Sequence, residues 1–278
     1  MNAINTCRYV IYEKKTIIFS SLSSIFLTDP SLVYQLWQHQ FLFSFKIDEF
    51  RKLVHKHYEK EIAQGELFDA RDLQRFNEND EYTLMFIQHG QFGTTFDQDR
   101  ALRVFNDSLA WRKRHNVYDI SPSEFPAEFF DRKAVYFQHH DKYNNPILNF
   151  AVRKLDKSKD DKEAVKRFIT YTFEKHLREN TGQKIVLLFD MSETGISHMD
   201  YDLVKFIIAS AQVFYPRLLA YMFMYKMPWL LTAAWKLIRT WMAAEAEQFI
   251  KFVDDKSIRD YVTPDQLSTA MGGTAIDG

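Results

Sequence analysis

The spacing of apolar residues changes along the chain, and the changes divide it into three parts. From residue 46 to 120 apolar residues recur every three or four positions, most regularly over 97–114, which predicts a small helical lobe. From residue 121 to 278 strands and helices are expected to alternate. Residues 1–45 form a poorly constrained leader with an apolar run at 16–27. That run is shorter than the roughly 20 residues a membrane span needs, although the lysines before it leave a signal peptide as an alternative.

The second half of the chain reads as an α/β domain with a mostly parallel sheet. The nearly uninterrupted apolar run at 184–190 is typical of a strand that is covered on both faces. The expected elements, in order, are a hairpin of strands at 135–139 and 147–152, a helix at 161–179, a strand at 184–190, a helix at 199–214 and a strand at 219–225. Such alternation produces parallel neighbours joined by right-handed crossovers.

The segment 227–242 is the most unusual helix that the pattern predicts. Pro228 suits the first position of a helix, and polar residues fall on one narrow stripe formed by Thr232, Lys236, Arg239 and Thr240. A helix that is apolar over most of its circumference needs cover from protein or lipid. Its tryptophans with Lys236 and Arg239 suit a membrane interface where those cations meet headgroups, and a core helix filled with tryptophan is the alternative.

Composition excludes several classes of protein. The net charge is −1, so no bulk electrostatic attraction to nucleic acid is expected. A single cysteine, Cys7, allows neither an internal disulfide nor a cysteine-based zinc site, and the cytoplasm is the expected compartment. Aromatic residues make up 16% of the chain. That share indicates either a large filled core or an apolar cavity with aromatic walls.

No catalytic motif is present in the sequence, and we expect neither an enzyme nor a bound cofactor. Phosphate-binding glycine loops, nucleophile elbows and zinc-protease motifs are all missing. The cluster His139-His140-Asp141 ends a predicted strand, where adjacent side chains point to opposite faces. We therefore expect no metal site there.

Several short segments, taken together, resemble the CRAL-TRIO lipid-binding domains. They are Gln212-Val-Phe-Tyr-Pro216, Met227-Pro-Trp-Leu230, Ala234-Trp-Lys-Leu-Ile238, the ending Asp265 to Thr274, and Phe105 to Val117 at the close of the helical lobe. The resemblance runs from about Glu66 to Thr274. Within the family, Phe189 to Gly195, Met227 to Leu231 and Met271 to Thr274 are most similar to a branch whose full-length members continue into a major sperm protein domain and a membrane anchor.

The resemblance implies a CRAL-TRIO domain at 121–278, with a sheet floor and an apolar cavity for a lipid or other hydrophobic molecule. A gate helix would close the cavity, and the protein would dock transiently on a membrane surface, peripherally at the endoplasmic reticulum if the native chain is longer. The candidate cavity walls are Phe189, Phe206, Phe223 and Tyr225. The candidate gate residues are Trp229, Leu231, Trp235, Ile238 and Trp241.

Three departures from the family pattern narrow the expected ligand. The phosphatidylinositol-transfer branch has Glu after the Tyr-Pro step, where this chain has Arg217. That branch also has Thr and Lys where this chain has Ala246 and Phe249. Since those groups hold the inositol phosphate, we expect a different lipid. The alternative is an interaction or membrane-docking module that kept the fold without an exchangeable ligand.

Overall fold

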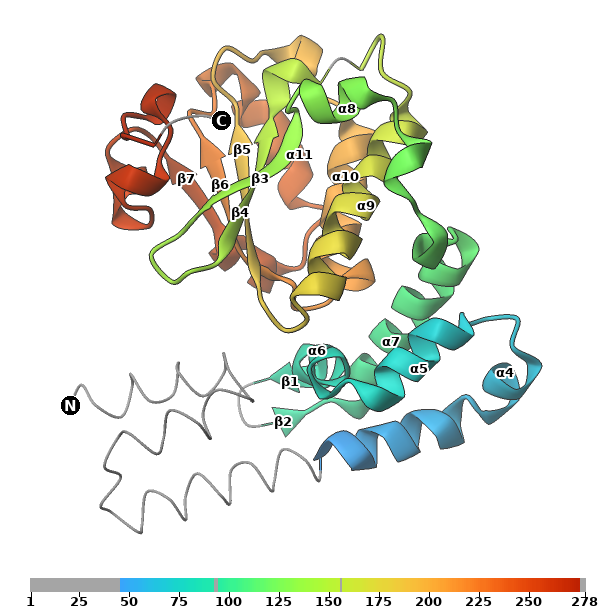
Figure 1. The fold of residues 1–278 in the computed structure, drawn as a ribbon. Coiled ribbons are helices and arrows are strands. Elements are labelled where there is room, and N and C mark those ends of the chain that lie inside the picture. Colours follow the sequence, from blue (N-terminus) through green and yellow to red (C-terminus); the bar gives the residue numbers. More distant parts are fainter. Residues whose placement is uncertain (1–45, 93–94, 156, 276–278) are drawn as a thin grey trace, which may run out of the picture.

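The computed structural model describes residues 46–92, 95–155 and 157–275. The predicted leader at 1–45, with Cys7, lies outside these residues. A helical lobe comes first, and an open sheet flanked by helices follows it (Figure 1).

The helical lobe contains the helices that the spacing predicts. Residues 46–57 are helical, and they are followed by α4 (Glu59–Gln64), α5 (Ala70–Glu78), α6 (Asp80–Gly90) and α7 (Gln98–Arg114), with a short hairpin of β1 (Gln91–Phe92) and β2 (Thr95–Phe96) before α7. The side chains of Asp69, Asn79 and Asp97 cap α5, α6 and α7 by accepting backbone N–H groups of the first turn. Asn79 both ends α5 and caps α6, so these two helices follow each other directly.

Aromatic side chains fill the interior of this lobe. Phe105 of α7 lies at the centre, with ring centroids 4.8 Å from Phe76, 5.4 Å from Phe86 and 5.5 Å from Phe68. All three pairs adopt edge-to-face geometry, which aromatic rings prefer to face-to-face stacking. Part of the high aromatic content of the chain is therefore ordinary core.

The second part contains the mostly parallel sheet that the sequence predicts. Its strands are β3 (Val135–His140), β4 (Pro146–Ala151), β5 (Ile185–Asp190), β6 (Leu219–Tyr225) and β7 (Ile250–Val253), in the spatial order β3-β4-β5-β6-β7. β3 and β4 form the expected antiparallel hairpin, and every later pairing is parallel. The α/β prediction is confirmed. β7 was not predicted, because its four residues follow an irregular run.

The two faces of the sheet are covered by different elements. Phe150, Phe189 and Met224 are neighbours across β4, β5 and β6, and this face lies toward α9 (Lys162–Glu179), α10 (Tyr201–Ala209) and α11 (Thr232–Arg239). The opposite face carries Leu188 and Phe223, which pack on the C-terminal turns (Figure 1). These turns span Ser257–Asp260, Pro264–Gln266 and Thr269–Met271.

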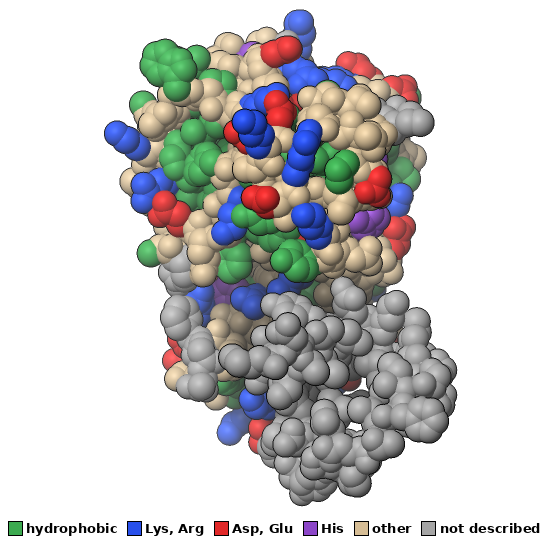
Figure 2. Space-filling model, turned by 90° about the vertical axis from the view of Figure 1, so that its left-hand side faces the viewer, with side chains coloured by type: hydrophobic (Ala, Val, Ile, Leu, Met, Phe, Trp, Pro, Cys, Tyr) green, Lys and Arg blue, Asp and Glu red, His purple; other side chains and the backbone are tan. Residues whose placement is uncertain are grey.

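The surface shows no single charged field. In the view of Figure 2, hydrophobic side chains lie in small groups between basic and acidic ones. This mixture agrees with a net charge of −1.

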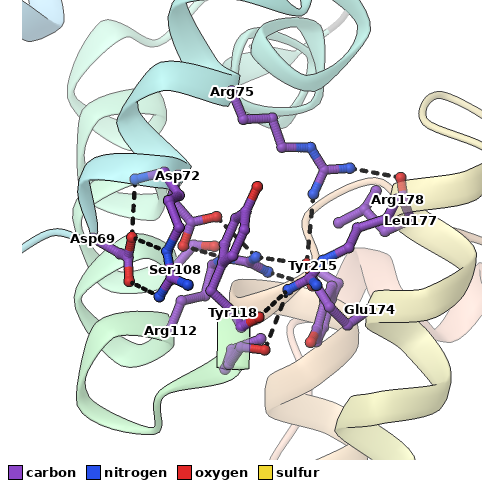
Figure 3. A network of polar contacts seen from close by, with 12 residues as sticks. Asp69, Asp72, Arg75, Ser108, Arg112, Tyr118, Glu174, Leu177, Arg178 and Tyr215 are labelled. Atoms are coloured by element: carbon purple, nitrogen blue, oxygen red, sulfur yellow. Dashed lines mark hydrogen bonds and ion pairs between the residues drawn. The ribbon is translucent and has the colours of Figure 1, made fainter. Parts of the chain in front are cut away.

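A buried ion network joins the helical lobe to the sheet domain (Figure 3). Arg112 of α7 is 1% exposed; its Nε donates to Asp72 of α5 at 2.9 Å, and its two Nη atoms donate to the carboxylate of Glu174 of α9 at 2.7 and 2.9 Å. Arg178 adds a third hydrogen bond to Glu174 at 2.7 Å, and Arg75 donates to the Leu177 carbonyl at 2.6 Å. The bidentate contact between Arg112 and Glu174 fixes α7 against α9 in one orientation.

The pKa of Glu174 shows how strongly the network favours the charged carboxylate. Burial by itself would raise this pKa, but the charge and hydrogen bonds of Arg112, helped by Arg178 and Arg75, lower it from 4.5 to about 2. A carboxyl group whose folded-state pKa is lowered stabilises the fold at pH values above its unfolded pKa.

We expect Arg112→Met to destabilise the protein by about 3–5 kcal/mol, because it leaves Asp72 and Glu174 as buried charges without their shared partner. Urea denaturation measures this free energy of unfolding. The control is Lys162→Met, since the Lys162–Asp202 ion pair is exposed and its charged atoms are 3.7 Å apart; such pairs contribute less than about 1 kcal/mol. Equal losses in the two variants would contradict a central role for Arg112.

A second expectation concerns pH. The Glu174 contribution is complete above about pH 4.5 and disappears as the pH falls toward about 2. The stability gap between the wild type and Glu174→Gln should therefore narrow over that interval. Urea denaturation at a series of pH values measures the gap, with Glu163→Gln on the exposed side of α9 as the control. A gap that stays constant down to pH 2 would contradict the assignment.

Candidate functional site

An apolar cavity lies between the sheet, α10 and α11. The centre of a water-sized sphere can move through a volume of about 130 Å³ inside it. In the same measure one water molecule needs about 10–15 Å³, so the cavity has room for roughly ten water-sized groups. That room suits a hydrocarbon chain or a compact hydrophobic molecule.

Side chains of the central strands form the cavity floor. Phe150 and Phe189 stack with their ring centroids 4.6 Å apart, and Met222, Met224 and Ile250 continue the floor toward β7. Alternate residues of a strand point to the same face, so Met222 and Met224 reach the cavity together.

Helix α10 supplies one wall. Leu203, Val204, Ile207 and Ile208 all line the cavity, at the spacing of a single helix face. The side chain of Asp200 begins the helix by accepting the backbone N–H groups of Asp202 and Leu203. After Ala209 the helix widens into a π-turn at Ser210–Phe214, which carries the chain away from the cavity.

Helix α11, with the residues that flank it, covers the cavity from the other side. Leu231, Trp235, Ile238 and Met242 line it, separated by four, three and four positions. This is the spacing of one helix face. Leu231 and Ile238 are buried, while Thr232, Lys236 and Arg239 are exposed on the other side of the helix.

Methionine is concentrated in the cavity. Six of the nine methionines of the chain line it, namely Met191, Met199, Met222, Met224, Met227 and Met242. Methionine side chains are unbranched and flexible, so they adapt to occupants of different shape. The cavity can therefore change its contour without rearranging the backbone.

The charged residues that line the cavity lie on one side, at 157–166 and 198–200. Lys157 donates to the Met199 carbonyl at 3.1 Å, and Lys166 pairs with Glu163 at 2.7 Å. Asp160 accepts from Arg132 at 2.7 Å. These charges are satisfied by the protein itself, so the cavity presents a mainly apolar interior.

Of the predicted cavity walls, the structure brings Phe189 to the cavity. Phe206 packs instead with Trp111 and Phe214, with ring centroids 6.4 and 6.5 Å away. Phe223 and Tyr225 lie on the opposite face of the sheet, where Tyr225 donates to the Asp255 carboxylate. The reason is the pleat, because Met222 and Met224 occupy the alternate positions of β6 that face the cavity.

The predicted gate residues divide into two groups. Leu231, Trp235 and Ile238 face the cavity, whereas the Trp229 side chain is 86% exposed. Trp241 leans on α10, with its ring 5.7 Å from Tyr201 and 4.8 Å from the Lys205 ammonium. Lys236 and Arg239 point to solvent, and Arg239 pairs with Glu247 at 2.9 Å.

The helix is shorter than the predicted 227–242. Pro228 lies one residue before a 3₁₀ turn at Trp229–Leu231 rather than at the first position of the helix. The α-helix itself covers Thr232–Arg239, and a further 3₁₀ run follows at Ala244–Phe249. The α-helix thus lies between two irregular segments.

Within 46–92, 95–155 and 157–275, no group of three or more His, Cys, Asp or Glu side chains is arranged to hold a metal ion. In the same part of the chain, every helix is too short or too polar to cross a membrane.

Comparison with known proteins identifies the family. The CRAL/TRIO domain model matches residues 130–273, more than half of the chain. The chain belongs to the CRAL-TRIO family. Proteins of this family bind or transfer lipids and are not enzymes, and the matched region is a lipid-binding or transfer domain.

Two curated relatives and one solved structure are similar to the chain. A CRAL-TRIO domain-containing protein of Schizosaccharomyces pombe is 26% identical over 187 residues, which are 63% of this chain and 42% of the relative. Phosphatidylinositol transfer protein CSR1 of Eremothecium gossypii is 24% identical over 193 residues, 64% of this chain and 44% of the relative. The chain thus spans less than half the length of these relatives.

The solved structure is the crystal structure of Sfh5, with a TM-score of 0.58, 15% identity, and coverage of 78% of this chain and 82% of that chain. At this level of identity the similarity concerns the fold. It agrees with the helical lobe and sheet described above.

Sequence reasoning missed most of the lining residues. On the helix predicted at 199–214 it points to Phe206 rather than to the residues that line the cavity, and on β6 it points to Phe223 and Tyr225 rather than to Met222 and Met224. The signal that identifies the correct face is the register, in which Phe189 of β5 is opposite Met224 of β6. One cavity residue on β5 therefore fixes the cavity-facing set on β6.

We expect Ile208→Trp to fill the cavity and weaken the uptake of a fluorescent fatty acid by about tenfold or more. Overpacking by the larger side chain would then destabilise the ligand-bound protein by about 1–3 kcal/mol. The control is Ile196→Trp, since Ile196 is 71% exposed and lies outside the cavity. Equal uptake by both variants, with thermal stability unchanged, would exclude this cavity as the binding site.

Proposed function

We propose that the chain binds one lipid or other hydrophobic molecule in the cavity, with α11 as the gate. The observation that carries the proposal is the apolar cavity of about 130 Å³ between the sheet, α10 and α11. Removing apolar surface from water contributes about 25 cal/mol per Å². A ligand enclosed by these three elements would gain most of its binding energy in this way.

The competing proposal is an interaction module without an exchangeable ligand. In such a module side chains would fill the space between the sheet and α11. The open volume and its adaptable methionine lining favour the ligand-binding function. Native mass spectrometry of the purified protein, followed by lipid extraction, separates the two. Protein that carries no lipid and takes none from liposomes would support the interaction module.

The contacts that hold α11 are suited to a gate. Trp235, which also lines the cavity, meets Phe252 at 5.1 Å, and Trp241, two residues after the helix, meets Tyr201 of α10 at 5.7 Å. Phe252 is 49% exposed. Contacts that are open to water cost little to break, and the 3₁₀ segments on both sides can absorb the backbone change.

The outer side of the gate also suits transient docking on a membrane. Trp229, Leu230 and Leu237 are 86%, 38% and 47% exposed, beside the cations Lys236 and Arg239. Tryptophan prefers the level of the lipid headgroups, and lysine and arginine attract their phosphates. Docking would bring the gate to the lipid it exchanges.

The ligand is proposed to be a lipid recognised mainly through its hydrocarbon part. The relative from Eremothecium gossypii is named for phosphatidylinositol transfer. This chain has Arg217, Ala246 and Phe249 at the positions expected to hold the inositol phosphate. Phe249 cannot bind phosphate, so we propose a lipid other than phosphatidylinositol.

We also propose that the chain is related to the CRAL-TRIO region of motile sperm domain-containing protein 2. The motifs Phe189 to Gly195 and Met271 to Thr274 support it. Peripheral location at the endoplasmic reticulum would follow if the native chain is longer.

The gate is tested by Trp235→Asp combined with Ile238→Asp. Both side chains face the cavity, so two carboxylates there should reduce the retention of a co-purified lipid by at least about tenfold, since burying a charge without a partner is costly. Lipid mass spectrometry measures retention, and circular dichroism checks that the sheet remains folded.

The matched control is Ala233→Asp combined with Leu237→Asp, which places the same charges on the exposed side of the same helix. This variant should retain lipid and lose binding to liposomes that carry anionic lipids. If the two double variants behave alike in both assays, α11 does not act as a gate with distinct inner and outer sides.

A further inference from the structure

The polar end of the cavity lies where the chain leaves strands β4 and β5. The segment after β4 contributes Lys157 and Asp160 to the lining, and the segment after β5 contributes His198 and Asp200. These strands are parallel neighbours, so both segments meet at the carboxyl ends of the sheet strands, where open α/β sheets bind their ligands. The sheet floor, α10 and α11 supply apolar side chains. The polar end of a bound molecule would therefore lie beside these two segments.

The two carboxylates at this end are already engaged by the protein. Asp160 pairs with Arg132, whose Nη1 donates to it at 2.7 Å. Oδ1 of Asp200 accepts the backbone N–H groups of Asp202 and Leu203 at 3.0 and 3.1 Å, which begins α10. Among the described residues, neither carboxylate forms an ion pair with the lysine at 157. Both carboxylates therefore serve the fold at this end of the cavity.

Lys157 carries a positive charge that no carboxylate of the described chain neutralises. Its Nζ donates to the Met199 carbonyl at 3.1 Å, and within 46–92, 95–155 and 157–275 it makes no other hydrogen bond or ion pair. An ammonium group has three N–H donors, so two of them stay open to a ligand. The other lysines of the lining, Lys162 and Lys166, have carboxylate oxygens at 3.7 and 2.7 Å. Lys157 is thus the lysine at this end that is best placed to bind an anionic group.

The half-buried imidazole of His198 offers a second donor. The backbone N–H of Gly195 donates to its Nδ1 at 3.1 Å, and the Ser197 hydroxyl lies 3.3 Å from the same nitrogen. A nitrogen that accepts a hydrogen bond carries no proton, so the neutral ring holds its proton on Nε2. The described chain places no hydrogen-bond partner on Nε2, and the ring lines the cavity. The loop before α10 therefore presents an N–H donor to a ligand.

Lys157 and His198 belong to the same corner of the cavity. The carbonyl that Lys157 binds is that of Met199, the residue directly after His198. This hydrogen bond places the ammonium beside the segment that carries the imidazole. Two donors, one of them charged, suit a carboxylate, which accepts through two oxygens. An alcohol would add a further donor at an end whose carboxylates are already engaged.

The volume of the cavity fits one hydrocarbon chain. About 130 Å³ accommodates roughly ten water-sized groups, by the allowance of about 10–15 Å³ for each. A methylene group is similar in size to a water molecule, so this room corresponds to a chain of medium length. A phospholipid with two acyl chains has several times as many methylene groups. The volume thus favours a molecule with a single chain.

We propose that the ligand of this cavity is a single-chain fatty acid, with its carboxylate bound between Lys157 and His198. The inference rests on the lipid-binding function proposed above and names the class of lipid. One carboxylate oxygen accepts from Nζ of Lys157, and the other accepts from Nε2 of His198. The chain extends over Phe189 and Met224 of the floor toward Ile238 of α11. With the head at the rim and the chain inside, the apolar surface of the ligand is removed from water.

The test measures the displacement of Nile red, a neutral dye that fluoresces in apolar sites, from the whole chain at neutral pH. The competitors are decanoic acid and methyl decanoate, which share one chain and differ in the charge of the head. The variants are Lys157→Met, His198→Asn and His198→Gln. In His198→Asn the amide oxygen can accept the Gly195 N–H in place of Nδ1, while the donor at Nε2 is lost. In His198→Gln the longer side chain brings an amide N–H back toward the Nε2 position.

The matched control is Lys142→Met. Lys142 is exposed, and its Nζ also donates to a backbone carbonyl, that of Arg259, at 2.7 Å. It lies on the turn between β3 and β4, outside the cavity lining. Its replacement therefore removes the same charge and the same kind of hydrogen bond without touching the proposed site.

We expect decanoic acid to displace the dye at a concentration about fivefold or more below that of methyl decanoate. Lys157→Met and His198→Asn should each weaken the acid by about fivefold, the loss of one charge-assisted hydrogen bond at a partly exposed site, and leave the ester unchanged. His198→Gln should recover part of the loss, since it restores a donor. Lys142→Met should match the wild type with both competitors.

The failure of this inference differs from the failure of the lipid-binding function. If acid and ester compete equally well in the wild type, or if Lys157→Met and His198→Asn weaken both alike, the carboxylate site is wrong while the cavity still binds hydrophobic molecules. If the wild type binds neither the dye nor either competitor, both proposals are wrong. Thermal unfolding of each variant checks that the fold is intact, and the exposed position of Lys157 makes Lys157→Met the safer of the two tests.

Discussion

The fixed orientation of the helical lobe against the sheet domain depends on the charge of Arg112. A guanidinium with 1% exposure between Asp72 and Glu174 is tolerated only when all three side chains are in place. Trp111, the preceding residue, stacks on Phe214 at 4.0 Å, so the same turn of α7 also contacts the π-turn that ends α10. Since α10 forms a wall of the large cavity, the ion network indirectly sets the position of that wall.

The large cavity exists because two amphipathic helices meet a sheet without filling the space between them. α10 presents four aliphatic side chains, and α11 presents Trp235 and Ile238. Most other apolar surfaces of the described chain are closed by direct packing, as in the aromatic cluster around Phe105. The contrast explains how a chain rich in phenylalanine has both a dense lobe and an open cavity. The helical lobe is closely packed, whereas the open cavity lies next to α11, the helix that is proposed to move.

Much of the fold could be predicted from the sequence, because it follows from local spacing. The strand at Leu219–Tyr225 and the helix at Lys162–Glu179 agree with their patterns to within a residue. The site was harder to predict, because which side of β6 faces the cavity depends on pairing with β5 and on what covers each face. Phe223 and Tyr225 look like cavity walls by size and aromatic character, yet their parity along the strand places them on the other face. β7 was missed because Ile250–Val253 acquires strand geometry only by pairing with β6.

Because side chains alternate between the two faces of the sheet, the seven residues of β6 are under two different evolutionary constraints. Phe223 and Tyr225 belong to the core that closes the back of the sheet, so their replacement is penalised through stability whatever the cavity contains. Met222 and Met224 face the cavity, so the effect of replacing them depends on which ligand the cavity binds. Selection for stability and selection for ligand specificity thus act on alternate residues of one strand. A change of ligand could spread through a lineage along the even positions while the odd positions keep the fold.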